Sequence, residues 1–204
     1  LIAASEKQIE VAHGNGGHGR WGHDFKMLKD PYGNNTGFER ELKRFSPEQK
    51  SAWLDAYTPK NEAMISQNLE GKELALWKFN RYIKDYLRTI QSVDDGVGEV
   101  LDYLDQEGLT ENTIVVYTSD QGFYLGEHGW FDKRFMYEES LRTPILMRYP
   151  NEIPAGSKVD KMIQNLDFAP TFLDYAGIKK PEDMQGASFR DIVNQKGGAW
   201  RDAI

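Results

Sequence analysis

The sequence predicts an α/β fold, in which helices alternate with the strands of a sheet. A long amphipathic helix is predicted at residues 72–107, and an apolar, β-branched strand follows at 113–119. A second strand is predicted at 144–149 and a further helix at 167–176. A helix that leads into a buried strand through a few residues is typical of the αβ half of a parallel unit. The order of the elements therefore indicates an α/β domain.

The first 71 residues are predicted to form a surface excursion with one short helix. Residues 1–45 are rich in Gly, His, Asn and charge, and such a composition cannot bury enough apolar area to fold by itself. A helix is expected after Ser46, since Ser is a favoured N-cap residue and Pro47 suits the first helical position. Its expected apolar face consists of Ala52, Trp53, Ala56 and Tyr57.

The long helix carries a stripe of apolar residues on one face. These residues recur three and four positions apart, which is the helical period, and Gly108 is expected to end the helix. The adjacent Asp94 and Asp95 diverge by about 100°, so they do not make a paired-carboxylate catalytic site. The stripe consists of Leu76, Phe79, Ile83, Tyr86, Leu87, Ile90, Val93, Val97, Val100, Leu101 and Leu104.

The last third of the chain is predicted to add one helix and then a polar tail. Asp167 is the expected cap of the helix at 167–176, and Pro170 is tolerated because it falls in the first turn. The chain becomes polar from Lys179, and no further core element is predicted. The expected divisions are the excursion with its short helix at 1–71, the core at 72–186 and a truncated tail at 187–204.

Composition excludes several classes of function. The chain has 204 residues, of which 39% are hydrophobic, as in an ordinary globular domain. Its net charge of −7 argues against nonspecific binding of nucleic acid, which depends on basic surfaces. The sequence contains neither an apolar run long enough for a membrane span nor a signal peptide at its start. The absence of cysteine excludes disulfides and thiol catalysis.

Polar and charged residues gather where the strand at 113–119 ends. In open α/β sheets, the carboxyl ends of strands face the ligand crevice. Asp120 and Gln121 follow the strand directly and offer carboxylate and amide oxygens, which suit calcium or magnesium better than zinc. The structural alternative is a strand-end turn in which Asp120 bonds to the backbone two residues on. Within the next fifteen residues come His128, Lys133 and Arg134.

The motifs of this region follow a familiar order. Asp-Gln-Gly after the strand is followed by Leu-Gly-Glu-His-Gly, then by Lys133 five residues before Glu138, then by Arg-Thr-Pro. The stretch NLDFAPTFLDYAG at 165–177 continues the pattern. This order resembles the carboxy-terminal part of the catalytic domain of type I sulfatases, in the alkaline-phosphatase-like superfamily. Its spelling is most similar to bacterial carbohydrate sulfatases such as N-acetylglucosamine-6-sulfatases, over roughly residues 72–186.

The resemblance implies a fold and a chemistry. The fold would be part of an alkaline-phosphatase-like mixed sheet flanked by helices. The reaction would be hydrolysis of sulfate esters on a sulfated carbohydrate, with a formylglycine nucleophile and a calcium ion. Asp120 and Gln121 would be metal ligands, and Lys133 would bind the sulfate. His128 would either protonate the leaving alcohol or hold the loop together, and Arg134 would contact the sugar or pair with Glu138 or Glu139.

Part of the family pattern is missing from the chain. The nucleophile motif of these enzymes is Cys or Ser followed by x-Pro-Ser-Arg, and none of the eight prolines here precedes Ser-Arg. No early strand ends in paired aspartates. We therefore expect the chain to be a piece of a larger, periplasmic or secreted enzyme, and to be inactive alone. Exposed strand edges would favour its self-association.

Two other function classes stay open at this point. A phosphodiesterase or phosphonate hydrolase of the same superfamily would share the fold and the metal chemistry. A noncatalytic module that binds carbohydrate or protein is compatible with the missing nucleophile. A metal site at His13, His18 and His23 is disfavoured, because a spacing of five does not place two ligands on one helical face.

Overall fold

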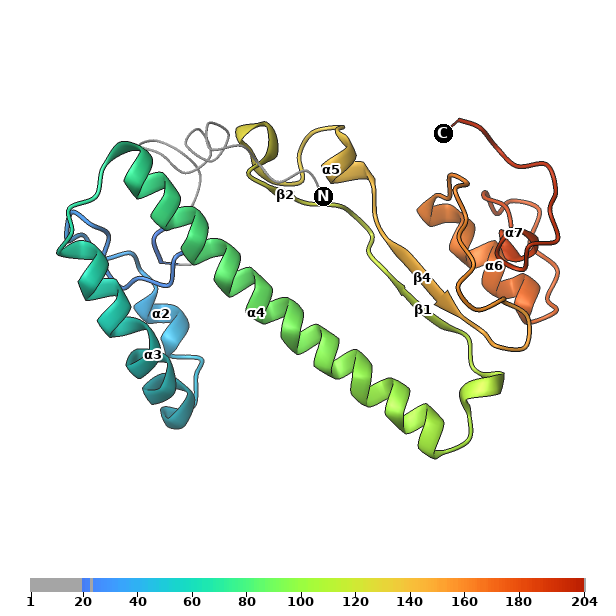
Figure 1. Ribbon diagram of the computed structural model, residues 1–204, viewed down its shortest axis with the longest axis horizontal. Coiled ribbons are helices and arrows are strands. Elements are labelled where there is room, and N and C mark those ends of the chain that lie inside the picture. The colour runs from blue at the N-terminus through green and yellow to red at the C-terminus, as the bar shows by residue number, and fades with distance from the viewer. Residues whose placement is uncertain (1–19, 23, 204) are drawn as a thin grey trace. The chain divides into compact units, whose positions relative to one another are not determined.

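The computed structural model describes residues 20–22 and 24–203, and the chain divides into two compact units. In its described part, unit 1 comprises residues 20–95 and Gln121–Arg142, and unit 2 comprises Gly96–Asp120 and residues 143–203. Figure 1 shows the helices and strands in chain order. Each unit thus combines two separate segments of the sequence.

Unit 1 begins with the helices α2 (Glu39–Leu42) and α3 (Pro47–Ile65). The predicted helix start is confirmed, because Ser46 and Gln49 form a reciprocal capping box with Pro47 at the first helical position. The helix is longer than the short one predicted and continues past Pro59. Only two of the four residues predicted for its inner face, Trp53 and Tyr57, point inward. Ala52 and Ala56 are exposed, whereas the inward positions, four or three residues apart, are Trp53, Tyr57, Asn61 and Met64.

The core of unit 1 forms between α3, the start of the long helix and the segment before α2. Its fully buried members include Phe25 and Met27, which come from the region predicted as a surface excursion. Met64 of α3 and Leu74 complete the cluster, and the rings of Trp21 and Trp77 pack against it. This part of the chain therefore contributes side chains to the core.

The long helix α4 (Gly71–Gln106) is confirmed almost at its predicted limits. It ends before Gly108, whose φ of 65° suits a glycine at a helix end. Figure 1 shows α4 as one continuous helix. No member of the predicted apolar stripe is among the buried residues of α4. Four of its members are exposed in the described structure: Leu87, Ile90, Val93 and Val100.

Unit 2 contains a two-stranded sheet. Strand β1 (Val115–Thr118) pairs with β4 (Ile145–Arg148) in antiparallel register, with Val115 opposite Arg148 and Thr118 opposite Ile145. Both predicted strands therefore form, although they are shorter than expected. In the described residues β1 has no parallel partner, so the predicted parallel pairing is not observed. Small sheets together with helices confirm the α/β class.

The helix predicted at 167–176 is observed as α6 (Phe168–Tyr175), preceded by the 3₁₀ turn η3 (Asn165–Asp167). Asp167 does not cap α6 with its side chain. Its buried carboxylate instead accepts hydrogen bonds from the backbone of Gln164 and Ala187 and from Arg201. Burial alone would raise the pKa of Asp167, but these hydrogen bonds lower it below its usual value.

The region after Lys179 does contribute to the core, contrary to the sequence prediction. A short helix α7 (Arg190–Val193) forms there, and Phe189, directly before it, is fully buried. The Phe189 ring meets the Phe168 ring of α6 edge-on, with 5.6 Å between centroids. One aromatic residue in a polar segment was too weak a pattern to predict this helix.

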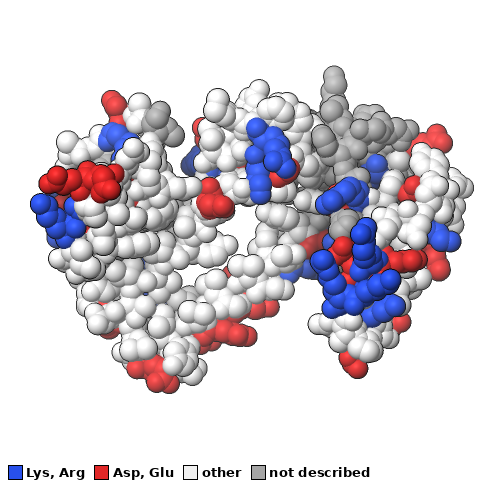
Figure 2. Space-filling view, turned by 180° about the vertical axis from the view of Figure 1, so that it is seen from behind, with Lys and Arg blue, Asp and Glu red and all other residues white. Residues whose placement is uncertain are grey.

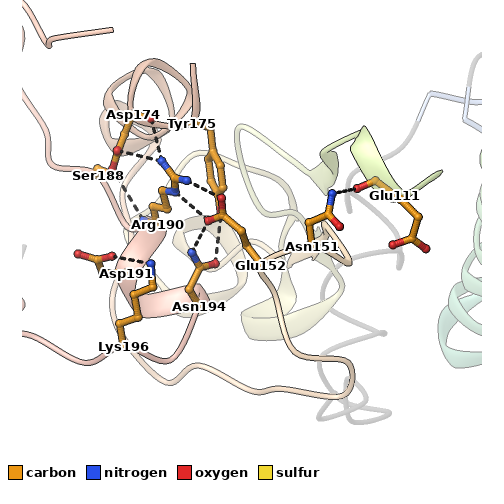
Figure 3. A network of polar contacts seen from close by, with 10 residues as sticks. All are labelled: Glu111, Asn151, Glu152, Asp174, Tyr175, Ser188, Arg190, Asp191, Asn194 and Lys196. Carbon is orange, nitrogen blue, oxygen red and sulfur yellow. Dashed lines mark hydrogen bonds and ion pairs between the residues drawn. The ribbon is translucent and has the colours of Figure 1, made fainter. Parts of the chain in front are cut away.

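A polar network joins α6, α7 and the segment after β4 (Figure 3). The Arg190 guanidinium donates two hydrogen bonds to the carboxylate of Glu152 and one to the main-chain oxygen of Asp174. Asn194 also donates to Glu152, at 2.7 Å, and the Arg190 guanidinium lies over the Tyr175 ring at 4.5 Å. Arg190 is therefore the centre of a clamp that fastens three segments of unit 2.

The surface carries charges of both signs. On the face shown in Figure 2, basic and acidic side chains lie next to one another in small groups, with neutral surface between the groups. Among the described helices, none combines the length and apolar character needed to cross a bilayer.

Candidate functional site

A small hairpin in unit 1 carries most of the candidate site. Its strands are β2 (Tyr124–Leu125) and β3 (Phe131–Asp132), which pair in antiparallel register. Tyr124 is fully buried, and its hydroxyl donates a hydrogen bond of 2.9 Å to the main-chain oxygen of Phe135. Burial raises the pKa of Tyr124, which keeps this donor protonated. This hydrogen bond ties β2 to the segment that follows β3.

Gly122 fixes the approach to the hairpin. A Cβ atom at this position would lie 2.1 Å from the main-chain oxygen of Glu139 in helix α5 (Glu138–Leu141). The Gly122 N–H donates to the main-chain oxygen of Ser140 at 2.8 Å. Only glycine allows this close approach of two backbones. The close packing of the two backbones therefore explains why the third residue of the Asp-Gln-Gly sequence is glycine.

His128 lies in the hairpin turn and is held by two neighbours. Its φ of 57° is left-handed, and its ring stacks on Tyr137 with 4.6 Å between centroids. Its Nε2 atom is 3.1 Å from a carboxylate oxygen of Glu139. Since an ionised carboxylate can only accept, Nε2 carries the proton in this pair. The side chain remains 38% exposed, so the ring is both oriented and accessible.

Lys133 and Arg134 follow β3 and differ in their pairing. Arg134 forms an ion pair of 3.1 Å with Asp132 and not with Glu138 or Glu139, which was one of the two alternatives considered; its contact with a sugar stays a prediction. Lys133 is exposed and makes no hydrogen bond or ion pair with any described residue. Its ammonium is thus available to an anionic ligand, whereas the neighbouring guanidinium is already neutralised in part.

Asp120 and Gln121 are neighbours in the chain that belong to different units, Asp120 to unit 2 and Gln121 to unit 1. Asp120 is exposed, and its main-chain oxygen accepts a hydrogen bond of 3.0 Å from Asn165. The strand-end turn considered as an alternative is not formed, because the N–H two residues on, of Gly122, bonds to Ser140. No described residue donates to the Asp120 carboxylate. That carboxylate can accept a cation.

The described residues do not form a complete calcium site. Nowhere in residues 20–22 and 24–203 do three His, Cys, Asp or Glu side chains come together in a way that could hold a metal ion. Calcium takes about six to eight oxygen ligands. Asp120 alone would supply only one of these ligands, so its role as a metal ligand stays a prediction. His13, His18 and His23 lie outside the described residues.

Sequence reasoning found the hairpin residues and missed those that hold them. Glu139 and Tyr137 orient His128, but their sequence positions gave no sign of this contact. The only available signal was the acidic pair at Glu138 and Glu139, from which a partner for Arg134 was inferred. The fold assigns these acids differently, because the turn brings His128 and not Arg134 to Glu139.

Comparisons with known proteins identify relatives of this chain. Residues 126–204 match the family model described as N-sulphoglucosamine sulphohydrolase, C-terminal. An N-acetylglucosamine-6-O-sulfatase of Bacteroides thetaiotaomicron is 49% identical over 181 residues, which cover 87% of this chain and 32% of that protein. An extracellular sulfatase SULF-1 homolog of Drosophila melanogaster is 41% identical over 117 residues, or 57% of this chain and 10% of that protein.

A solved structure supports the same assignment. The structure of BT4656 in complex with its substrate D-glucosamine-2-N,6-O-disulfate superposes with a TM-score of 0.76 at 47% identity, over 81% of this chain and 34% of that one. The fold is therefore that of an alkaline-phosphatase-like domain. The chain belongs to the sulfatase family, as the resemblance in its sequence indicated. It spans about a third of the length of the first two proteins that it matches.

Proposed function

We propose that the intact protein hydrolyses sulfate esters of carbohydrates and that this chain supplies its sulfate-binding lysine. The observation that carries the proposal is the contrast between two adjacent cations. Arg134 is paired with Asp132, whereas the exposed ammonium of Lys133, beside the hairpin, pairs with none of the residues that the structure describes. A fixed cation of this kind stabilises the negative charge on sulfate oxygens as the sulfur–oxygen bond breaks.

His128 is the proposed proton donor to the leaving alcohol. The Glu139 carboxylate and the Tyr137 ring fix the orientation of its imidazole. A histidine changes charge near neutral pH, which suits transfer of a proton to an alkoxide. The two roles are compatible when both imidazole nitrogens carry a proton. Nε2–H then donates to Glu139, and Nδ1–H, which has no partner in the described structure, supplies the proton for the alkoxide.

The proposed metal is calcium, with Asp120 and Gln121 among its ligands and the rest from other residues of the intact protein. When bound, calcium would polarise the sulfate oxygens. The exposed, unpaired carboxylate of Asp120 supports its part in this set. The Gln121 amide is the weaker candidate, since it is half-buried and already engaged within the chain. The proposed nucleophile is a formylglycine, for which this chain has no precursor motif.

The proposed substrate is a sulfated glucosamine unit, and the proposed location is the periplasm or the cell exterior. Both follow from relatives: one is named for N-acetylglucosamine 6-O-sulfate, one binds a disulfated glucosamine, and one is extracellular. In the intact protein, sulfate release from N-acetylglucosamine-6-sulfate is the test. Hydrolysis of a phosphonate ester or a phosphodiester, without release of sulfate, would favour a phosphonate hydrolase or a phosphodiesterase. Sugar binding without hydrolysis of any ester would favour a binding module.

A further inference from the structure

A polar pocket in unit 1 has no part in the site described above. Its volume is about 500 Å³, a size suited to a small ligand. Its wall on α3 is Tyr57, and its wall on α4 includes Tyr82, Asp85, Tyr86 and Arg88. The segment before α2 closes it with Asp24 and Lys26. Aromatic rings and charged groups therefore face one space from three parts of the chain.

In this pocket, Asp85 carries a hydrogen-bond acceptor that is not satisfied in the described structure. One of its carboxylate oxygens accepts hydrogen bonds from the Tyr57 hydroxyl at 2.9 Å and from Arg88 at 2.6 Å. The other oxygen, Oδ2, is buried and accepts no hydrogen bond in the described structure, and the side chain is only 11% exposed. A buried acceptor without a donor is costly, typically by about 1–3 kcal/mol. Asp85 lines the pocket, so a small rotation of its carboxylate would present this oxygen to a hydroxyl group of a ligand.

The backbone at Lys26 is held in an unusual conformation beside the same pocket. Its φ of 56° is left-handed, which is uncommon for a residue with a side chain. The buried amide of Asn61 donates to the main-chain oxygen of Lys26 at 2.7 Å, and Arg81 in turn donates to Asn61. The Arg81 guanidinium lies over the Tyr57 ring at 5.1 Å. The pocket is therefore fixed by buried groups before any ligand arrives.

The pocket adjoins the hairpin that carries the candidate site. The Tyr82 ring meets Phe131 of β3 edge-on at 4.9 Å, and the Tyr86 ring stacks on Phe123 at 6.2 Å. Phe131 precedes Lys133 by two residues. A ligand that spans the pocket and the hairpin would thus present one part to the tyrosines and another to the lysine ammonium.

The charges of the pocket indicate what it binds. Asp24 and Asp85 are opposed by Lys26 and Arg88, so neither a free anion nor a bare cation is favoured. Balanced donors and acceptors beside three tyrosine rings suit a neutral ring with many hydroxyl groups. We propose that this pocket binds a sugar ring of the sulfated carbohydrate, with Asp85 as the acceptor for a sugar hydroxyl. The identity of the ligand as part of the substrate rests on the proposed sulfatase function.

The test is binding of unsulfated N-acetylglucosamine to the intact protein, measured by ligand-observed NMR or calorimetry. Asp85→Asn should weaken binding about tenfold to a hundredfold, which is the effect of losing a charge-assisted hydrogen bond. The matched control is Asp102→Asn, an exposed carboxylate on the same helix outside the pocket, which should bind as the wild type does. Thermal unfolding of each variant establishes that it is folded.

A second variant guards against misfolding at Asp85. Arg88 is largely exposed, so Arg88→Gln should fold normally and still weaken sugar binding several-fold by removing a donor. If folded Asp85→Asn and Arg88→Gln both bind the sugar within twofold of the wild type, the pocket is not a sugar site. No sugar binding by the wild type overturns the inference as well, and a water would then satisfy Asp85. Failure of the sulfatase proposal would be a separate result. The intact protein would then release no sulfate, while the wild type would still bind N-acetylglucosamine and the two pocket variants would bind it more weakly.

Discussion

At the scale of single residues, local pairing decides which charges are available for chemistry. Lys133→Ala in the intact enzyme should lower the rate of sulfate release about a hundredfold to a thousandfold, the usual loss for one stabilising contact to a developing charge. Arg134→Ala should have a much smaller effect, because Arg134 is engaged by Asp132. Steady-state kinetics on N-acetylglucosamine-6-sulfate would measure both. A Lys133→Ala enzyme with a near-normal rate would remove Lys133 from the sulfate pocket.

Gly122 provides a second residue-scale prediction, in which the backbone and not a side chain is decisive. Gly122→Ala would place a methyl group 2.1 Å from the Glu139 main-chain oxygen, so the hairpin or α5 must shift. We expect destabilisation of at least about 1–3 kcal/mol, as for other overpacked positions. The control is Gly96→Ala in α4, where a Cβ meets nothing within 4 Å and should stabilise the helix by up to about 1 kcal/mol. Thermal unfolding midpoints that move alike in both variants would contradict this.

At the scale of elements, the sequence could predict helices from local signals and could not predict how strands pair. The capping pattern at Ser46 and the terminator at Gly108 act within one turn, so both helix limits came out close to the observed ones. The pairing of β1 with β4 depends on the path of the intervening hairpin and α5, which no period in the sequence records. The same holds for α7, which the buried Phe189 and the Arg190 clamp attach to α6.

The clamp at Arg190 gives a prediction on the pH dependence of one element. The hydrogen bond from Arg190 lowers the pKa of Glu152 below its unfolded value. The stabilising contribution of Glu152 is therefore present above its unfolded pKa and is lost as the pH falls through the lower, folded pKa. After correction for the intrinsic pH dependence of amide exchange, the protection of the amides in α6 and α7 should fall over that acidic range in the wild type.

The variant Glu152→Gln tests this assignment of the acid response. It should exchange faster at neutral pH and show a smaller further change on acidification, since its side chain does not titrate. Asp191→Asn is the control, because Asp191 makes only a 4.0 Å contact with Lys196 on the surface. An exchange rate in Glu152→Gln that follows the wild type at every pH would show that the clamp does not hold α6 and α7 together.

At the scale of the whole molecule, the described residues offer too few ligands for the proposed calcium ion. The candidate metal ligands came from sequence motifs, and their number among the described residues falls short of a calcium shell. Several apolar side chains of α4 and β1 also remain exposed in the described structure. Residue periodicity shows which face of a helix is apolar but not what covers it. The resemblance supplied the missing context, because the chain spans only about a third of the N-acetylglucosamine-6-O-sulfatase and of the solved structure that it matches.

Calcium binding can separate the contribution of this chain from that of the whole protein. One free carboxylate and one amide fall far short of about six to eight oxygens, so the 204-residue chain should bind calcium only at about millimolar concentration or more weakly. The intact enzyme should bind it tightly, and Asp120→Ala should lose calcium and activity together, because removing a charged ligand weakens the ion that organises the site. Lys133→Ala, by contrast, should keep its calcium. Calorimetric titration decides the matter: micromolar binding by the chain alone, or full calcium occupancy in intact Asp120→Ala, would mean that the ligands lie elsewhere.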